Sequence, residues 1–478
     1  MAQSVVFHKV YGYSSTGHDF GNCVIEAQDS GFIAGGDTYS LPTGEGYYAV
    51  RVDRHGDTVW QSAHDYSVPG GDAILSMVGL PDGDILACGA TFDTIEGAAE
   101  TFFLRLDSSG NAKWHRTYDA GFNDWPKMMK KLTDSTVVVA GRFHDPDTLA
   151  KVTLFLLVAD TSGTVLWQQD YFGWFSIYPR SVDLTADGGF VIGGYFLSAA
   201  SNSWDLFLLK TDSEGEMEWF RRYGDGRDEI GGYSIATSDS GYAIVGYRFL
   251  DASGDISAGY FVKTDENGEV QWQRLYDNRV NDIDLLSHVQ QLASNSYVVA
   301  GATWVEDAFS VWLLKLDPYG DTLWTRGYSY YGGTTLTRAE DLKVTSDGGF
   351  ILAGWIINNG LPARNDLWLL KTDSLGRTCS PPPCSGVIEV VEGVSAAQGS
   401  ELTIHPNPAS GYVMITSSLS TQAEFVLHDV TGREVLRQTV QAHQAVVIEL
   451  GGLHAGLYVY EARSGDFRST GKLLVIKE

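Results

Sequence analysis

Residues 210–219, KTDSEGEMEW, indicate the fold, because nearly the same pattern returns at regular intervals along the chain. In this stretch an aspartate stands three residues before a glycine and seven before a tryptophan. Asp and Gly indicate a tight turn, since the Asp side chain accepts hydrogen bonds from nearby amides and Gly tolerates positive φ. The aspartates with this spacing are Asp53, Asp107, Asp160, Asp212, Asp265 and Asp317, and the tryptophans are Trp60, Trp114, Trp167, Trp219, Trp272 and Trp324.

A second phrase, of the type DGGFVIGG, recurs seven times at intervals of 53, 52, 53, 52, 55 and 53 residues. Its copies begin at Asp29, Asp82, Asp134, Asp187, Asp239, Ser294 and Asp347. A repeat of this length indicates a solenoid or a propeller. Within residues 181–224, period-two alternation predicts four strands: SVDLTA, FVIGGYF, DLFLLKT and EMEWFRRY. One such sheet buries too little apolar surface alone, so seven copies predict a toroidal array in which each tryptophan packs between neighbouring blades.

The seventh unit lacks its last strand, because Ser380 stands where the tryptophan is expected after Asp373 and Gly376. The missing strand is found at the other end of the chain. In residues 4–12, SVVFHKVYG, Phe7 takes the tryptophan position and Tyr11 the position of a recurrent tyrosine. We therefore predict an all-β fold: a seven-bladed β-propeller over residues 4–376, closed by an N-terminal strand that leaves no sheet edge open.

The composition changes after the repeats. Residues 377–400 are rich in Pro, Ser, Gly and small side chains and predict a linker. Residues 401–478 alternate apolar and polar positions between turns and predict a small Ig-like β-sandwich. Cys379 and Cys384 would close a small disulfide loop in an oxidising space, whereas Cys23 and Cys88 fit buried thiols in apolar strands.

The charge and hydropathy patterns exclude several partners. The chain carries 60 acidic and 33 basic side chains, for a formal charge of -27. Because this excess repels phosphate backbones and anionic lipid, nucleic acid is not an expected partner. No run of 18 apolar residues occurs, so no membrane span is predicted.

The repeats resemble the DGGY-type repeats of secreted propellers of Bacteroidota and, more distantly, quinoprotein-type repeats. Quinoprotein dehydrogenases have eight blades and often adjacent cysteines in the cofactor site. This chain has seven copies and no Cys-Cys pair. No cofactor is therefore predicted.

The tail carries four landmarks in order: Pro406, Asn407 and Pro408; Gly432 within DVTGR; Gly456 and Tyr458 within AGLY; and a last strand with Lys472, Leu474 and Ile476. It resembles the type A C-terminal sorting domain of type IX secretion substrates. The resemblance implies a bacterium of the Bacteroidota type, Sec export to the periplasm, and the type IX translocon and its outer-membrane carrier as partners. It also implies a secreted or outer-cell-surface location. The half-apolar last strand suits strand addition by a carrier.

The loops between second and third strands, and between consecutive blades, share one face of the predicted ring and vary in content. Variable loops on a rigid ring are the usual binding surface. Near the channel mouth on this face the sequence places five acidic residues: Asp19, Asp72, Asp124, Glu229 and Asp284. Two interpretations are open. Each carboxylate caps the amides of its own loop, or the ring attracts calcium or a cationic ligand through its oxygens.

The fourth unit breaks this acidic pattern with the aromatic stretch YFGWFSIYP, and the third unit carries a tryptophan next to its aspartate. Trp125, Trp174, Phe175 and Tyr178 lie near the same channel mouth. They either fill space between blades or form a stacking platform for sugars or peptide side chains.

The sequence contains no G-x-S-x-G, H-E-x-x-H or Gly-rich phosphate loop. Binding of a glycan or protein ligand through the variable-loop face is therefore favoured over catalysis. One alternative is a secreted carbohydrate- or peptide-degrading enzyme that uses a carboxylate pair such as Asp72 and Glu229. A second is a structural surface protein.

Overall fold

The computed structural model describes residues 5–14, 17–66, 70–93, 98–144, 151–171, 176–198, 202–251, 254, 256–277, 283–305, 308–330, 337–358, 364–378, 387–390, 402–405, 412–417, 421–429, 432–441, 445–450, 452–454, 456–464 and 467–475. In these residues every regular element is a β-strand. None of them forms a helix long and apolar enough to cross a membrane.

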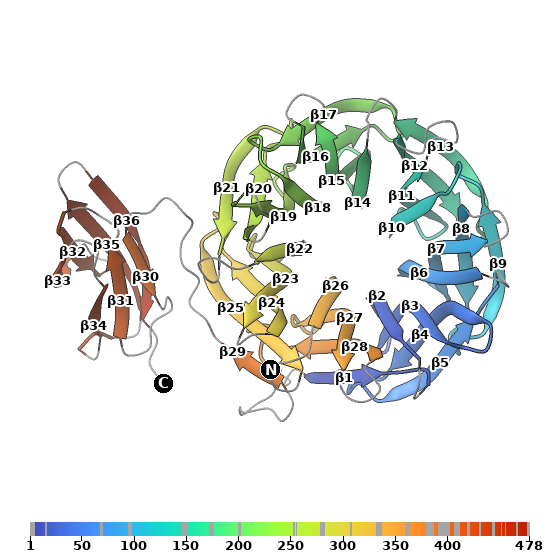
Figure 1. Ribbon diagram of the computed structural model, residues 1–478, viewed down its shortest axis with the longest axis horizontal. Helices are drawn as coiled ribbons and strands as arrows, with labels where there is room; N and C mark the ends of the chain where they lie inside the picture. The colour runs from blue at the N-terminus through green and yellow to red at the C-terminus, as the bar shows by residue number, and fades with distance from the viewer. Residues whose placement is uncertain are drawn as a thin grey trace.

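Strands β1–β28 form seven antiparallel sheets around a ring, as predicted (Figure 1). Blades one and two contain β2 (Asp19–Glu26), β3 (Phe32–Leu41), β4 (Gly44–Val52), β5 (Thr58–His64), β6 (Gly70–Gly79), β7 (Ile85–Asp93), β8 (Ala98–Leu106) and β9 (Ala112–Tyr118). Blades three and four contain β10 (Trp125–Lys131), β11 (Thr136–His144), β12 (Val152–Asp160), β13 (Val165–Tyr171), β14 (Ile177–Leu184), β15 (Phe190–Ser198), β16 (Ser203–Thr211) and β17 (Met217–Tyr223). Blades five and six contain β18 (Glu229–Ala236), β19 (Tyr242–Phe249), β20 (Ser257–Thr264), β21 (Val270–Tyr276), β22 (Leu285–Gln291), β23 (Tyr297–Val305), β24 (Ala308–Leu316) and β25 (Thr322–Tyr330).

Blade seven is closed by the N-terminal strand. It contains β26 (Thr337–Val344), β27 (Phe350–Asn358), β28 (Arg364–Thr372) and, on its outer edge, β1 (Phe7–Tyr11). Strand β1 pairs antiparallel with β28, so that Phe7 lies opposite Lys371 and Lys9 opposite Leu369. The predicted closure is confirmed.

The recurrent spacing of Asp, Gly and Trp is explained by contacts between blades. Gly110 has a φ of 83° and lies under the indole of Trp60 from the preceding blade; a Cβ there would come within 2.6 Å of the ring. The same contact joins Trp114 to Gly163, Trp167 to Gly215, Trp219 to Gly268, Trp272 to Gly320, Trp324 to Gly376 and, at the closing strand, Phe7 to Gly56. The glycine thus serves both the turn and the close approach of the aromatic ring.

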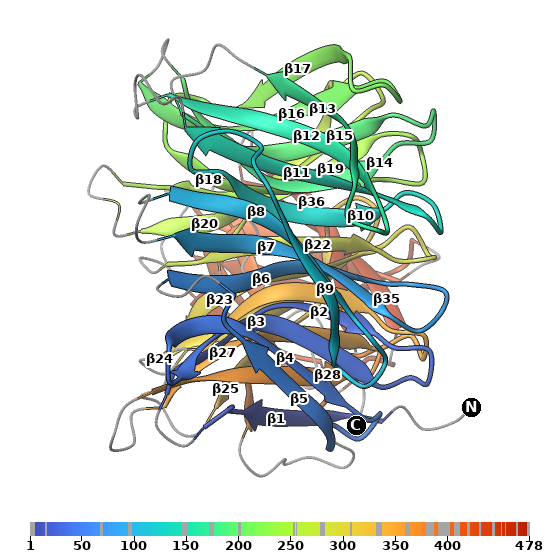
Figure 2. The same cartoon turned by 90° about the vertical axis from the view of Figure 1, so that its right-hand side faces the viewer.

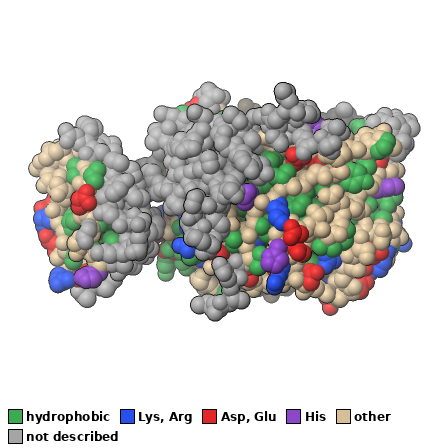
Figure 3. Space-filling view, turned by 90° about the horizontal axis from the view of Figure 1, so that it is seen from below, with side chains coloured by type: hydrophobic (Ala, Val, Ile, Leu, Met, Phe, Trp, Pro, Cys, Tyr) green, Lys and Arg blue, Asp and Glu red, His purple; other side chains and the backbone are tan. Residues whose placement is uncertain are grey.

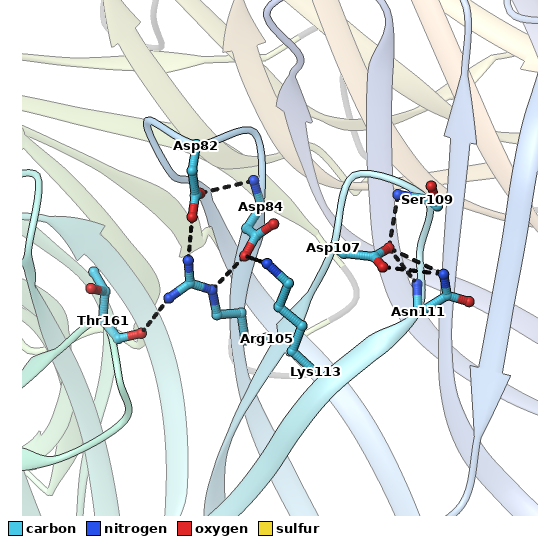
Figure 4. A network of polar contacts seen from close by, with 8 residues as sticks. All are labelled: Asp82, Asp84, Arg105, Asp107, Ser109, Asn111, Lys113 and Thr161. Carbon is cyan, nitrogen blue, oxygen red and sulfur yellow. Dashed lines mark hydrogen bonds and ion pairs between the residues drawn. The ribbon is translucent and has the colours of Figure 1, made fainter.

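Polar contacts fix the turns on this side of the ring (Figure 4). The carboxylate of Asp107 accepts hydrogen bonds from the amides of Ser109, at 2.8 Å, and Asn111, at 2.9 Å. Arg105 of β8 pairs with Asp84 at 2.6 Å and donates to the carbonyl of Thr161 in the next blade at 3.3 Å. Arg105 therefore ties the turn that carries Asp84 to β8 and to the next blade.

The strand ends gather at two opposite faces of the ring (Figure 2). The turns with Asp and Gly occupy one face. The other face, at which the first and third strands begin and the second and fourth strands end, we call the variable-loop face. On the side of the ring seen in Figure 3, acidic, basic and histidine side chains lie next to one another.

Part of the predicted linker 377–400 is regular. Strand β29 (Val387–Val390) pairs antiparallel with β25, with Val390 opposite Gly327, and becomes the fifth strand of blade six. The outer strand of that blade therefore gains a partner from the C-terminal segment. Cys379 and Cys384 lie outside the described residues. Cys23 and Cys88 are free, buried thiols, as expected.

The C-terminal region contains two small sheets. One has the order β30 (Leu402–His405), β31 (Tyr412–Ser417) and β34 (Ala445–Glu449). The other has the order β33 (Glu434–Val440), β32 (Ala423–His428), β35 (Gly456–Ser464) and β36 (Phe467–Val475). Their buried side chains share one core, which includes Ile415, Phe425 and Leu473. The predicted small β domain is confirmed.

Candidate ligand site at the central channel

The predicted acidic residues stand at the start of inner strands, and all five are fully buried: Asp19, Asp72, Asp124, Glu229 and Asp284. Asp19 accepts a hydrogen bond from the Tyr13 amide at 3.0 Å, and Asp124 accepts one from the Ala120 amide at 3.0 Å. This geometry is that of loop capping.

The remaining members differ in detail. Asp72 accepts from the amide of Tyr66, so it also caps its own entry loop. Glu229 pairs with Arg248 at 2.7 Å, yet burial raises its pKa to about 8. The amide of Asp284 donates to the Ser257 carbonyl at 3.0 Å. In the part of the chain that the structure describes, no group of three or more His, Cys, Asp or Glu residues is arranged to hold a metal ion.

The aromatic candidates are distributed over blades three and four. Trp125 is half-buried and donates its indole N–H to Asn123 at 3.3 Å. Trp174 and Phe175 lie outside the described residues. Tyr178, the second residue of β14, belongs to a larger cluster.

This cluster is formed by Tyr178, Tyr195 and Trp204, which we call the aromatic ledge. Tyr178 and Tyr195 are directly opposite in the β14–β15 register, and their rings stack at 5.1 Å. The ring centre of Trp204, from β16, lies 5.6 Å from that of Tyr178 and 5.4 Å from that of Tyr195. The guanidinium of Arg142, from blade three, lies 4.5 Å from the Tyr178 ring. All three rings are half-buried, so part of the ledge faces solvent near the start of β14 and β16, at the variable-loop face.

The inner strands share a feature that the sequence pattern does not predict. In each of them the register with the second strand skips one residue, which forms a β-bulge at an equivalent position. The skipped residues, which we call the bulge ring, are Asn22, Leu75, Lys127, Arg180, Gly232, Ser287 and Glu340. A bulge leaves its residue out of the ladder and re-aims the side chain. All except Gly232 line a central cavity of about 290 Å³.

Charge is unevenly balanced around this cavity. Arg338 pairs with Glu340 at 2.7 Å, Lys343 with Asp341 at 2.7 Å, Lys130 with Asp183 at 2.6 Å and Lys131 with Asp134 at 2.6 Å. Lys127 and Arg180 belong to no such pair. Arg180 is the main cause of a Lys127 pKa lowered to about 8, and burial adds to the effect.

Neutral polar groups complete the wall of the cavity. His288 packs on Tyr233 with ring centres 4.4 Å apart, and its Nδ1 lies 3.1 Å from the hydroxyl of Ser287. Burial lowers the pKa of His288 to about 3, with Lys343, Arg180 and Lys127 acting in the same direction and Asp341 against it. His288 is therefore uncharged at neutral pH and adds no positive charge to the site.

A family model supports the prediction of a C-terminal sorting domain. Residues 403–477 match the model described as "Secretion system C-terminal sorting domain". Among the landmarks, Gly432 has a φ of 81° and its amide donates to Asp429, Gly456 begins β35, and the Tyr458 hydroxyl donates to the His454 carbonyl at 2.8 Å. Lys472 and Leu474 lie in β36. Residues 406–408 and Ile476 lie outside the described residues. The chain is thus a type IX secretion substrate that is exported and is secreted or held at the cell surface.

Solved structures resemble the propeller only in fold. Polysaccharide lyase Uly1 is 11% identical with a TM-score of 0.47, over 78% of this chain and 93% of that one. Pyrococcus horikoshii acylaminoacyl peptidase is 11% identical with a TM-score of 0.42, over 84% of this chain. This chain spans 58% of the peptidase's length. The β-propeller domain of the Trilobed protease from Pyrococcus furiosus is 10% identical with a TM-score of 0.31, over 64% of this chain and 97% of that one. No curated protein sequence matches the chain significantly.

Proposed function

We propose that the secreted propeller binds a glycan through its variable-loop face, with the aromatic ledge as the stacking surface. The observation that supports this is the meeting of three half-buried rings beside the channel. Sugar rings present C–H faces that pack on aromatic rings, while their hydroxyls need polar neighbours, which the bulge ring supplies. Asp19, Asp72 and Asp124 support this face of the ring by capping their own entry loops.

A glycan array followed by titration calorimetry tests the proposal. We expect Trp204→Ala to weaken binding of an array-identified glycan at least tenfold, which corresponds to about 1.4 kcal/mol. The matched control is Tyr319→Ala, because Tyr319 is 67% exposed and lies in an Asp–Gly turn on the opposite face. Equal loss in both variants, or no loss in either, would refute the ledge as the binding surface.

The principal competing function is that of a degrading enzyme. Asp72 and Glu229 are both fully buried, so neither offers an open carboxyl to a substrate in this structure. Turnover of any glycosidase substrate that is abolished by Asp72→Asn would favour the enzyme over the binding protein.

For the tail we propose that an outer-membrane carrier of a Bacteroidota-type bacterium binds β36 by strand addition. Strand β36 stands at the edge of its sheet, with β35 as its neighbour. An edge strand offers backbone N–H and C=O groups to an incoming strand.

A further inference from the structure

Lys127 and Arg180 are two like charges placed next to each other on adjacent blades. Each is the bulged residue of its inner strand, β10 or β14, and each lines the central cavity. Within the described residues, neither side chain takes part in an ion pair or a side-chain hydrogen bond. Two half-buried cations repel each other and so destabilise the folded protein. Such a pair is better explained by binding than by a structural role.

The composition of the chain makes this pair unusual. With 60 acidic residues against 33 basic ones, carboxylates are available to neutralise almost any cation. Lys210, Lys263 and Lys371, for example, each pair with an aspartate of the neighbouring turn. The strand that carries Arg180 instead begins with Ile177, where five other inner strands place a carboxylate.

An anionic group fits this geometry. The guanidinium of Arg binds carboxylate or sulfate oxygens in a fork, and the ammonium of Lys adds a point charge. Asn22 and Ser287, also in the bulge ring, line the same cavity and carry neutral polar groups. Salt screens distant charges beyond about 8–10 Å, so the acidic outer surface does not cancel the local attraction.

Resting on the glycan-binding function above, we propose that Lys127 and Arg180 form a subsite for the carboxylate or sulfate of an acidic sugar unit. The adjoining sugar ring lies on the aromatic ledge. The Arg142 guanidinium, already stacked on Tyr178, joins the ledge to this subsite. A sugar is favoured over an acidic peptide because the three rings of the ledge suit its C–H faces.

Titration calorimetry at pH 7 with matched probes tests the proposal: tetrasaccharides of glucuronate, of sulfated glucose and of glucose, and a tetraglutamate peptide. We expect an acidic tetrasaccharide to bind at least tenfold more tightly than the neutral one, since charge-assisted hydrogen bonds are the stronger class. Tighter binding of the glucuronate probe would indicate a carboxylate ligand, and tighter binding of the sulfated glucose probe would indicate a sulfate ligand. Arg180→Gln and Lys127→Gln should each remove this preference. Arg274→Gln, the same charge change on the outer strand β21, should keep it.

The outcomes separate the two proposals. Neutral and acidic tetrasaccharides binding alike, with loss only in Trp204→Ala, would overturn the anion subsite and leave glycan binding in place. Binding of tetraglutamate without any sugar would overturn the glycan function and the acidic-sugar subsite with it. Binding of no probe would refute both.

The subsite can also be tested in the wild-type protein, through the pKa of Lys127. Besides Arg180, the groups that act on Lys127 are Glu340 and Arg338 on β26 and Cys23 on β2. NMR titration of the lysine side chains should place the Lys127 pKa near 8, raise it in Arg180→Gln, and raise it again when an acidic sugar binds. A Lys127 signal that does not move on saturation with an acidic sugar would overturn the subsite, even if a glutamine variant fails to fold.

Discussion

Replacing Phe7 by alanine should destabilise the propeller at the place where β1 closes it. Phe7 is only 6% exposed. The centre of its ring lies 5.9 Å from that of Phe32, and the ring packs against the Gly56 turn of blade one. Truncation of a buried phenylalanine costs about 3–5 kcal/mol, and the slight exposure of Phe7 favours the lower end. We expect Phe7→Ala to reduce the free energy of unfolding by about 3 kcal/mol.

Urea denaturation followed by tryptophan fluorescence measures this loss. The control is Lys9→Ala in the same strand, which removes an exposed ion pair with Asp57 and should cost at most about 1 kcal/mol. Deletion of residues 1–12 should go further, because it exposes the edge of β28 and uncovers Leu367 and Leu369. The closure argument fails if Phe7→Ala costs less than about 1 kcal/mol, or if the shortened chain unfolds at the same urea concentration as the parent.

Four further outcomes are expected. His288 should contribute a loss of stability as pH drops from about 6.5 toward 3, because the unfolded chain then binds a proton while burial keeps folded His288 uncharged. This contribution is at most about 1.4 kcal/mol per pH unit and is measured as the difference in slope between the parent and His288→Gln, since Glu229, whose pKa burial raises to about 8, acts with the opposite sign in both proteins; equal slopes would contradict this origin. With the other two cysteines changed to serine, Cys23 and Cys88 should react with a thiol reagent only after unfolding, since both are buried and burial raises the pKa of each thiol. Leu474→Asp with Ile476→Asp should block secretion, and normal secretion would end the strand-addition proposal. Calcium should leave the melting temperature unchanged if the buried carboxylates act as caps, whereas a rise on titration would show that they bind the ion.

The sequence predicted those parts of the fold that depend on local chemistry. The Asp–Gly turns and the strand alternation are encoded within a few residues, and the role of Phe7 followed from its place in a repeat that had lost one tryptophan. Capping by Asp19 was one of two open interpretations, because a carboxylate at a loop start serves a backbone amide or a cation equally well until its burial is known.

The bulge ring was not predicted, for a physical reason. A bulge is a property of the register between two strands, and Lys127 and Arg180 read in the sequence as ordinary polar positions of an alternating strand. A comparison of the seven copies at this one position would have shown a varied, largely polar column that follows a column of apolar or small residues. The Tyr195 and Trp204 rings were missed because they approach Tyr178 across strands rather than along one.

The position of the site follows from how a repeated ring acquires function. The turn face has little freedom, because each turn must satisfy its own aspartate and also receive the aromatic ring of the preceding blade. The inner strands at the other face are free to differ at the bulge, where the side chain leaves the ladder without disturbing the pairing on either side. Blades three and four use this freedom together, because Lys127 and Arg180 occupy adjacent bulges. The sevenfold ring thereby carries a pair of cations, Lys127 and Arg180, in one sector. A ligand that binds this pair also lies beside the aromatic ledge of blade four.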